Sequence, residues 1–96
     1  MPAAYLIAEI EITNPEGYTE YTKAVPATVE KYGGKFLVRG GKAHPLEGDW
    51  PERRRVIIEF PSIERARAWW DSAEYAKPRS MRRANSKGRL IFLEGV

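Results

Sequence analysis

The apolar side chains of this chain recur with two different periods, and the order of these periods limits the possible folds more than any other feature. From Ala4 to Ile12 apolar residues alternate, a pattern typical of a strand. Asn14 and Pro15 then supply a helix cap and a proline suited to a first turn, and apolar residues follow at helical intervals. Pro26 is expected to kink this helix and Gly33-Gly34 to end it.

The remaining patterns predict two further strands, a second helix and a last strand. Lys35–Arg39 and Arg54–Phe60 alternate as strands, Ser62 can cap a helix, and Arg89–Glu94 is the last strand. This order predicts a ferredoxin-like βαββαβ domain of the α+β class, in which a four-stranded antiparallel sheet carries both helices on one face. We expect a single domain, residues 1–96.

The opposite face of this sheet would have no helix to cover it. By the alternation, Tyr5, Ile7 and Ile57 lie there, joined by Leu37, with charged residues among them. An apolar surface of this kind normally marks an interaction site. We therefore expect a homodimer in which two copies pack sheet to sheet and enclose a barrel-like interior, a dimeric α/β barrel.

Composition argues against several kinds of site. The chain has no cysteine and its only histidine is His44, so no metal site is expected. No haem, flavin or nucleotide motif is present. The pairs Gly33-Gly34 and Gly40-Gly41 lie at the two ends of one strand and do not join a strand to a helix as a phosphate-binding loop does, so no cofactor is expected. Without a membrane-spanning run or a secretory signal, the sequence predicts a cytoplasmic protein with no membrane partner.

Several stretches of the sequence resemble a known family. The matching segments are residues 32–41 (YGGKFLVRGG), 46–50 (LEGDW) and 56–62 (VIIEFPS), extended by Ser72, Glu74-Tyr75 and Arg82. Together they are similar to the domain of unknown function 1330 family, in the dimeric α/β-barrel superfamily that also contains cofactor-free monooxygenases and muconolactone isomerase. The resemblance covers essentially the whole chain and implies the fold and a dimer. Arg79 departs from it, because the family often has lysine there, and the proline next to Arg79 falls earlier.

Arg39 and Glu59 are the first candidate catalytic residues. Alternation places both on the face turned away from the helices, on neighbouring strands, so they are expected to meet inside the dimer. They could form a plain structural ion pair, because buried charges are generally paired. In the functional alternative, Arg39 holds a carboxylate or enolate while Glu59 or Glu9, with a pKa raised by burial, moves a proton.

The long loop from Lys42 to Arg53 supplies a second group of candidates. His44 can exchange protons near neutral pH, although a single loop histidine is commonly only solvated. Glu47 and Trp50 share the loop, and long loops in small domains often act as lids or binding loops. Trp50 is expected over the mouth of the barrel or against the partner subunit more than on a ligand.

A third group follows the second predicted helix. Ser72, Tyr75 and Arg82 occur where the chain crosses back to the last strand, and a tyrosine hydroxyl beside an arginine can orient an anionic or carbonyl substrate. The alternative is that Tyr75 anchors the segment and Arg82 caps a helix end. The basic stretch from Lys77 to Arg89 can attract anions or be a solvated surface.

Two classes of function fit these residues. The first is a cofactor-independent enzyme that acts on a small anionic or carbonyl substrate in a barrel cavity, and the second is a non-catalytic ligand-binding or interaction module. Turnover, as opposed to binding alone, separates them. RNA-recognition domains share the βαββαβ order, but Arg54–Phe60 lacks their glycine–aromatic pattern, so no nucleic-acid partner is expected.

Overall fold

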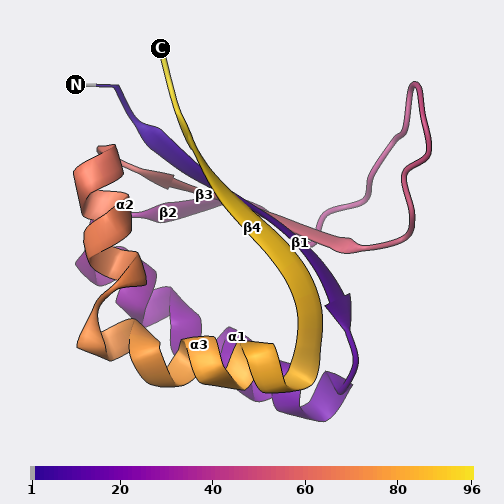
Figure 1. The fold of residues 1–96 in the computed structure, drawn as a ribbon, viewed down its shortest axis with the longest axis horizontal. Helices are drawn as coiled ribbons and strands as arrows, with labels where there is room; N and C mark the ends of the chain where they lie inside the picture. Colours follow the sequence, from indigo (N-terminus) through magenta and orange to yellow (C-terminus); the bar gives the residue numbers. More distant parts are fainter. Residues whose placement is uncertain (1) are drawn as a thin grey trace.

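The order of the elements agrees with the sequence prediction, with one helix added (Figure 1). A computed structural model describes residues 2–96. In chain order the elements are β1 (Ala4–Ile12), α1 (Pro15–Lys31), β2 (Lys35–Arg39), β3 (Arg54–Phe60), α2 (Ile63–Trp70), α3 (Ala73–Asn85) and β4 (Ser86–Glu94).

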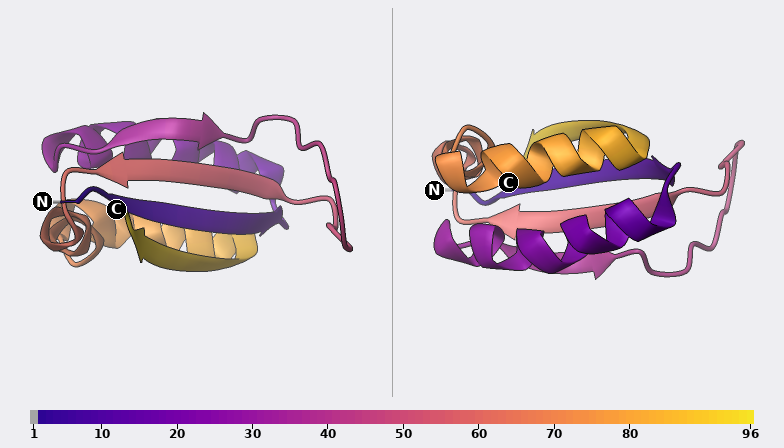
Figure 2. Two further views of the ribbon diagram at one scale, coloured as in Figure 1. Left: turned by 90° about the horizontal axis from the view of Figure 1, so that it is seen from above. Right: turned by 90° about the horizontal axis from the view of Figure 1, so that it is seen from below.

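The four strands form one antiparallel sheet in the order β2-β3-β1-β4. Leu6 of β1 lies opposite Ile58 of β3 and Phe92 of β4. All three helices lie on the same side of the sheet (Figure 2). The predicted ferredoxin-like fold is therefore confirmed, and no helix of residues 2–96 covers the second face of the sheet.

The core fills the space between the sheet and the helices. Trp69, Tyr75 and Phe60 are fully buried there, and the Trp69 ring centroid lies 5.3 Å from that of Phe60 and 4.1 Å from that of Tyr75. The Trp69 indole nitrogen donates a hydrogen bond of 3.0 Å to the Thr28 hydroxyl of α1. This cluster joins the two crossover segments, since Thr28 belongs to α1 and Trp69 to α2.

Helix α3 was not predicted, and β4 begins earlier than predicted. Ser72 caps α3, because its side-chain oxygen accepts a hydrogen bond of 3.1 Å from the Tyr75 amide. Pro78 lies inside this helix, where a proline normally argues against one. The buried residues Tyr75, Pro78 and Arg82 follow a helical spacing, but only one of them is a typical core residue. The basic stretch therefore belongs to α3 and the start of β4.

Strand β2 contains an irregularity that reverses the face of its last residues. Phe36 lies opposite Ile58, but Val38 lies opposite the very next β3 residue, Ile57. Leu37 is the extra residue of this β-bulge. Because side chains alternate along a strand, one inserted residue moves Arg39 to the helix side of the sheet, opposite Val56.

The loop between β2 and β3 has no regular structure and extends away from the sheet beyond the ends of its strands (Figures 1 and 2).

Helix α1 continues through Pro26 to Lys31. No helix within residues 2–96 combines the length and the apolar character needed to cross a membrane.

Candidate functional site

The predicted site residues lie in three separate places. Glu9 and Glu59 are on the uncovered face of the sheet, and His44, Glu47 and Trp50 are on the extended loop. A third group lies on the helix side of the sheet and consists of Arg39, Ser72, Tyr75 and Arg82.

The acids of the uncovered face have basic partners other than Arg39. Glu59 forms an ion pair of 3.3 Å with Lys35, the residue opposite it on β2. Arg39 instead donates a hydrogen bond of 2.7 Å to the backbone oxygen of Thr22 in α1. The prediction that Arg39 and Glu59 face one another was therefore wrong, because the bulge at Leu37 places them on opposite faces.

Glu9 is the centre of a small charged group on the same face. Its carboxylate oxygens lie 2.9 Å from a guanidinium nitrogen of Arg89 and 3.5 Å from one of Arg55. The Glu9 side chain is only 18% exposed, so the two arginines supply the counter-charge that a partly buried carboxylate requires. A structural role of Glu9 follows from this geometry.

The loop residues contact one another and not a cavity under the helices. The Trp50 indole donates a hydrogen bond of 2.6 Å to the Glu47 backbone oxygen, and the Arg55 guanidinium lies 5.4 Å from the Trp50 ring centroid. Trp50 is 56% exposed and His44 is exposed as well. In this chain alone the loop residues are remote from the buried polar groups described next.

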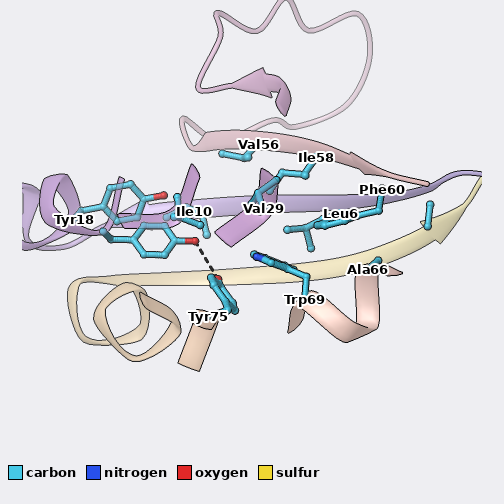
Figure 3. Packing of buried hydrophobic residues seen from close by; sticks show 14 residues of the cluster. Leu6, Ile10, Tyr18, Val29, Val56, Ile58, Phe60, Ala66, Trp69 and Tyr75 are labelled. Carbon is cyan, nitrogen blue, oxygen red and sulfur yellow. Dashed lines mark hydrogen bonds between the residues drawn. The ribbon is translucent and has the colours of Figure 1, made fainter. Parts of the chain in front are cut away.

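The buried polar groups form a short hydrogen-bonded chain beneath the helices. The hydroxyls of Tyr21 and Tyr75 lie 3.0 Å apart, and this contact is the dashed line that ends on Tyr75 in Figure 3. The Arg82 Nε donates a longer hydrogen bond of 3.4 Å to the Tyr75 hydroxyl. Tyr75, Arg82 and Tyr21 are 0%, 5% and 8% exposed. Ser72 positions Tyr75, because the Ser72 side chain caps the start of α3.

A cavity lies beside this chain of hydroxyls, between the sheet and α1. Its volume is about 30 Å³, enough for one or two water molecules. Apolar side chains of β1 and β3 form much of the wall. The polar lining is supplied by Tyr18, Tyr21, Thr22, Arg39, Arg54 and Arg82.

Three guanidinium groups thus line a cavity that has no carboxylate in its wall. Within residues 2–96, neither Arg39, Arg54 nor Arg82 forms an ion pair with an acidic side chain. The buried Arg54 Nε has no hydrogen-bond partner among these residues. Arg82 is 5% exposed, and a buried charge without a counter-ion is costly, so this arrangement favours an anion in the cavity.

The two tyrosines of the cavity are hydrogen-bond donors and not bases. Burial raises the pKa of Tyr21, and the nearby Tyr75 hydroxyl raises it further. Burial also raises the pKa of Tyr18, although the Arg54 guanidinium opposes that shift. Both hydroxyls therefore stay protonated at neutral pH.

Sequence reasoning missed Tyr18, Tyr21 and Arg54 as members of the site. The helical spacing of apolar residues after Pro15 includes both tyrosines and predicts only a buried face of α1, although two buried tyrosines bring two hydroxyls that need partners. The sequence did indicate the position of Arg54, because it lies two residues before Val56 on the same strand and therefore on the same, helix-covered face of the sheet. For metals, no cluster of three His, Asp or Glu side chains that could hold an ion occurs in the described part of the chain.

Comparisons with known proteins support the fold. A solved protein of unknown function from Rhodopseudomonas palustris, RPA0582, has a TM-score of 0.79 and 18% identity, covering 99% of this chain and 83% of that one. SnoaB, a cofactor-independent oxygenase from Streptomyces nogalater, has a TM-score of 0.64 and 9% identity, covering 97% of this chain and 92% of that one. No curated protein has a significantly similar sequence.

A family model settles the relationship that the sequence motifs suggested. It matches residues 3–96, which include all the strands and helices described above. The chain belongs to the family called domain of unknown function (DUF1330).

Proposed function

We propose that this chain binds a small organic anion in the cavity between the sheet and α1, and acts on it as an enzyme that needs no cofactor. The observation that carries the proposal is the set of three arginines around a cavity without a carboxylate. Arg82 contributes most, because it is 5% exposed and has no acidic partner within residues 2–96.

The chemistry follows from which groups are present. Guanidinium groups bind carboxylates and enolates through paired N–H donors, and tyrosine hydroxyls stabilise negative charge on oxygen. No Asp, Glu or His lines the cavity, so its wall offers no general base. A substrate that reacts here must therefore be acidic enough to bind as its anion. The cofactor-independent oxygenase SnoaB has a similar fold, which supports cofactor-free chemistry by analogy.

The volume of the cavity limits the size of the ligand. About 30 Å³ is room for one or two water molecules, so a carboxylate of the size of acetate requires the cavity to widen. Arg39 is exposed and its hydrogen bond to Thr22 joins two residues of the cavity wall. A larger substrate would enter after this hydrogen bond breaks and the Arg39 side chain turns outward.

The small volume also favours a second candidate, a binding module without turnover. The two candidates share the anion site and differ only in whether the bound compound is changed. Incubation with small enolisable acids and hydroxylated aromatic acids, followed by mass spectrometry, separates them. Conversion that Arg82→Met abolishes supports the enzyme, whereas binding with complete recovery of the compound supports the module.

We also propose that two copies pack through the uncovered face of the sheet. Leu37, Ile91 and Leu93 are 50%, 57% and 50% exposed there, beside Ile7 and Ile57. A monomer rarely leaves such a continuous apolar surface in water, and a two-fold dimer would cover it with itself. The anion site lies on the other side of the sheet, so each copy would keep its own.

The anion proposal is tested by thermal unfolding with a panel of sodium salts at constant ionic strength. A ligand that binds only the folded chain raises the melting temperature, and the rise grows with the logarithm of its concentration relative to its Kd once binding is near saturation. Formate, acetate and glyoxylate are expected to raise it in the parent and not in Arg82→Met. Equal shifts in both proteins would show that the salts act elsewhere.

A further inference from the structure

In the hydrogen-bonded chain Arg82–Tyr75–Tyr21, the chemistry of each side chain limits which group donates and which accepts. An arginine can only donate, so the Tyr75 oxygen accepts from Arg82 Nε. The 3.0 Å contact between the two hydroxyls can then run either way, because a hydroxyl oxygen accepts up to two hydrogen bonds. The two directions differ in which tyrosine, Tyr75 or Tyr21, has a hydroxyl proton that is not donated within this chain of hydrogen bonds.

If Tyr21 donated to Tyr75, the Tyr75 proton would have no acceptor among residues 2–96. Tyr75 is 0% exposed and does not line the cavity, so that proton would be buried and unsatisfied. If Tyr75 donates to Tyr21, the remaining proton belongs to Tyr21, which does line the cavity. The second direction leaves neither hydroxyl proton unpaired once the cavity holds an acceptor.

We infer that Tyr21 presents its O–H as a hydrogen-bond donor to the ligand, and that Tyr75 and Arg82 hold it in this orientation. This inference rests on the proposed function and adds the atom that recognises the ligand. The cavity then offers the Tyr21 hydroxyl together with the guanidinium groups of Arg39, Arg54 and Arg82, which line the same cavity. The matching ligand atom is an unprotonated oxygen, as in a carboxylate, an enolate or a phenolate.

The raised pKa of Tyr21 is consistent with this role. A phenol that remains protonated at neutral and moderately alkaline pH keeps its donor over the range in which a carboxylate is charged. The donor also strengthens when Arg82 polarises Tyr75, because hydrogen bonds in a series reinforce one another. Tyr75 is in these terms a positioning residue, since it acts through Tyr21.

The test measures acetate affinity by calorimetry at constant ionic strength in four proteins. Tyr21→Phe is expected to weaken acetate binding at least about tenfold, the usual effect of losing a hydrogen bond to a charged group. Tyr75→Phe leaves the Tyr21 hydroxyl in place but unoriented, so we expect a smaller loss of about threefold. Tyr32→Phe is the matched control, because the Tyr32 hydroxyl donates to Glu74 at the surface, and it should bind acetate as the parent does.

A spectroscopic measurement covers the case in which Tyr21→Phe is poorly folded. In the parent labelled with [¹³Cζ]tyrosine, acetate should shift the Tyr21 signal in a saturable way and leave the Tyr32 signal unchanged. If the parent binds acetate while Tyr21→Phe binds equally tightly and the Tyr21 signal stays constant, the inference is wrong and the arginine site stands. If the parent binds no carboxylate, both the inference and the proposed function fail.

Discussion

The Arg39 guanidinium donates a hydrogen bond of 2.7 Å to the backbone oxygen of Thr22, and so ties the end of β2 to α1 beside the cavity that both residues line. Arg39 is exposed, and an exposed contact of this kind contributes about 1 kcal/mol or less to stability. Arg39→Met should therefore unfold within about 1 kcal/mol of the parent in urea while binding small carboxylates more weakly. A loss of several kcal/mol would identify Arg39 as a structural residue instead.

Arg82 should behave in the opposite way from a paired buried charge. Replacing it by methionine removes an unpaired guanidinium from the core and keeps much of the volume, so the free energy of unfolding should stay constant or rise by up to about 3 kcal/mol. The exposed Arg83 on the same helix offers the control Arg83→Met, expected within about 0.5 kcal/mol of the parent. Destabilisation of Arg82→Met by more than about 3 kcal/mol in urea unfolding would contradict the unpaired state.

The glycines around β2 are restricted for two different reasons. Gly40 has φ 73°, which other residues adopt at a cost, whereas Gly34 is crowded, because a Cβ there would lie 2.7 Å from Phe60 Cε1 and from Val29 Cγ1. Of the two glycines expected to end α1, Gly33 has the positive φ, 80°, and Gly34 does not. Gly34→Val and Gly40→Val should each lose roughly 1–3 kcal/mol in thermal or urea unfolding.

Gly41 supplies the matched control for these variants. A Cβ at Gly41 would meet only Val38 Cγ1 at 3.9 Å, an ordinary contact, and its φ is not positive. Gly41→Ala should therefore melt within about a degree or two of the parent. If Gly34→Val and Gly41→Ala melt alike, the crowding of Gly34 by Phe60 and Val29 is incorrect.

Glu74 links α3 to α1 in a pH-dependent way. A hydrogen bond from Lys31, and a further one from Tyr32, lower the pKa of Glu74 to about 2 from its ordinary value of 4.5. A carboxyl whose pKa is lower in the folded state contributes stability that is present above pH 4.5 and lost as the pH falls toward 2. Urea unfolding of Glu74→Gln should show a shallower loss of stability over this window than the parent, and identical slopes would refute the contact.

The uncovered sheet face makes a prediction about assembly. Light scattering at micromolar concentration should give about twice the chain mass of 11.0 kDa. Ile91→Asp should give a monomer, because it places a charge within the proposed interface, while Ile12→Asp near the end of β1 should remain dimeric. A monomeric parent would remove the dimer from this account and leave the anion site unaffected.

The sequence could predict most of the fold because period and caps are local signals. The alternation of β1, the Ser62 cap of α2 and the four-stranded antiparallel sheet all appeared in the structure. Helix α3 escaped prediction because Pro78 and a polar composition weakened its pattern, while its buried face includes Arg82, a residue rarely found in a core.

The site was harder to predict, because one inserted residue decides which face a side chain occupies. Strict alternation placed Arg39 with Glu59, and the bulge at Leu37 moved Arg39 to the other side of the sheet. Tyr75 and Arg82 were predicted as neighbours and are hydrogen-bonded. Their partner Tyr21 lies 54 residues from Tyr75, and nothing local in the sequence connects the two.

The central claim, that the cavity holds an organic anion on its arginines, is tested most directly by NMR of the arginine side chains. In ¹⁵N-labelled protein titrated with acetate at constant ionic strength, the Nε–Hε signals of Arg54 and Arg82 should shift together and saturate, while the exposed Arg83 signal stays nearly constant. If all arginine signals drift together without saturation, the acetate is only screening surface charge, and the cavity is not an anion site.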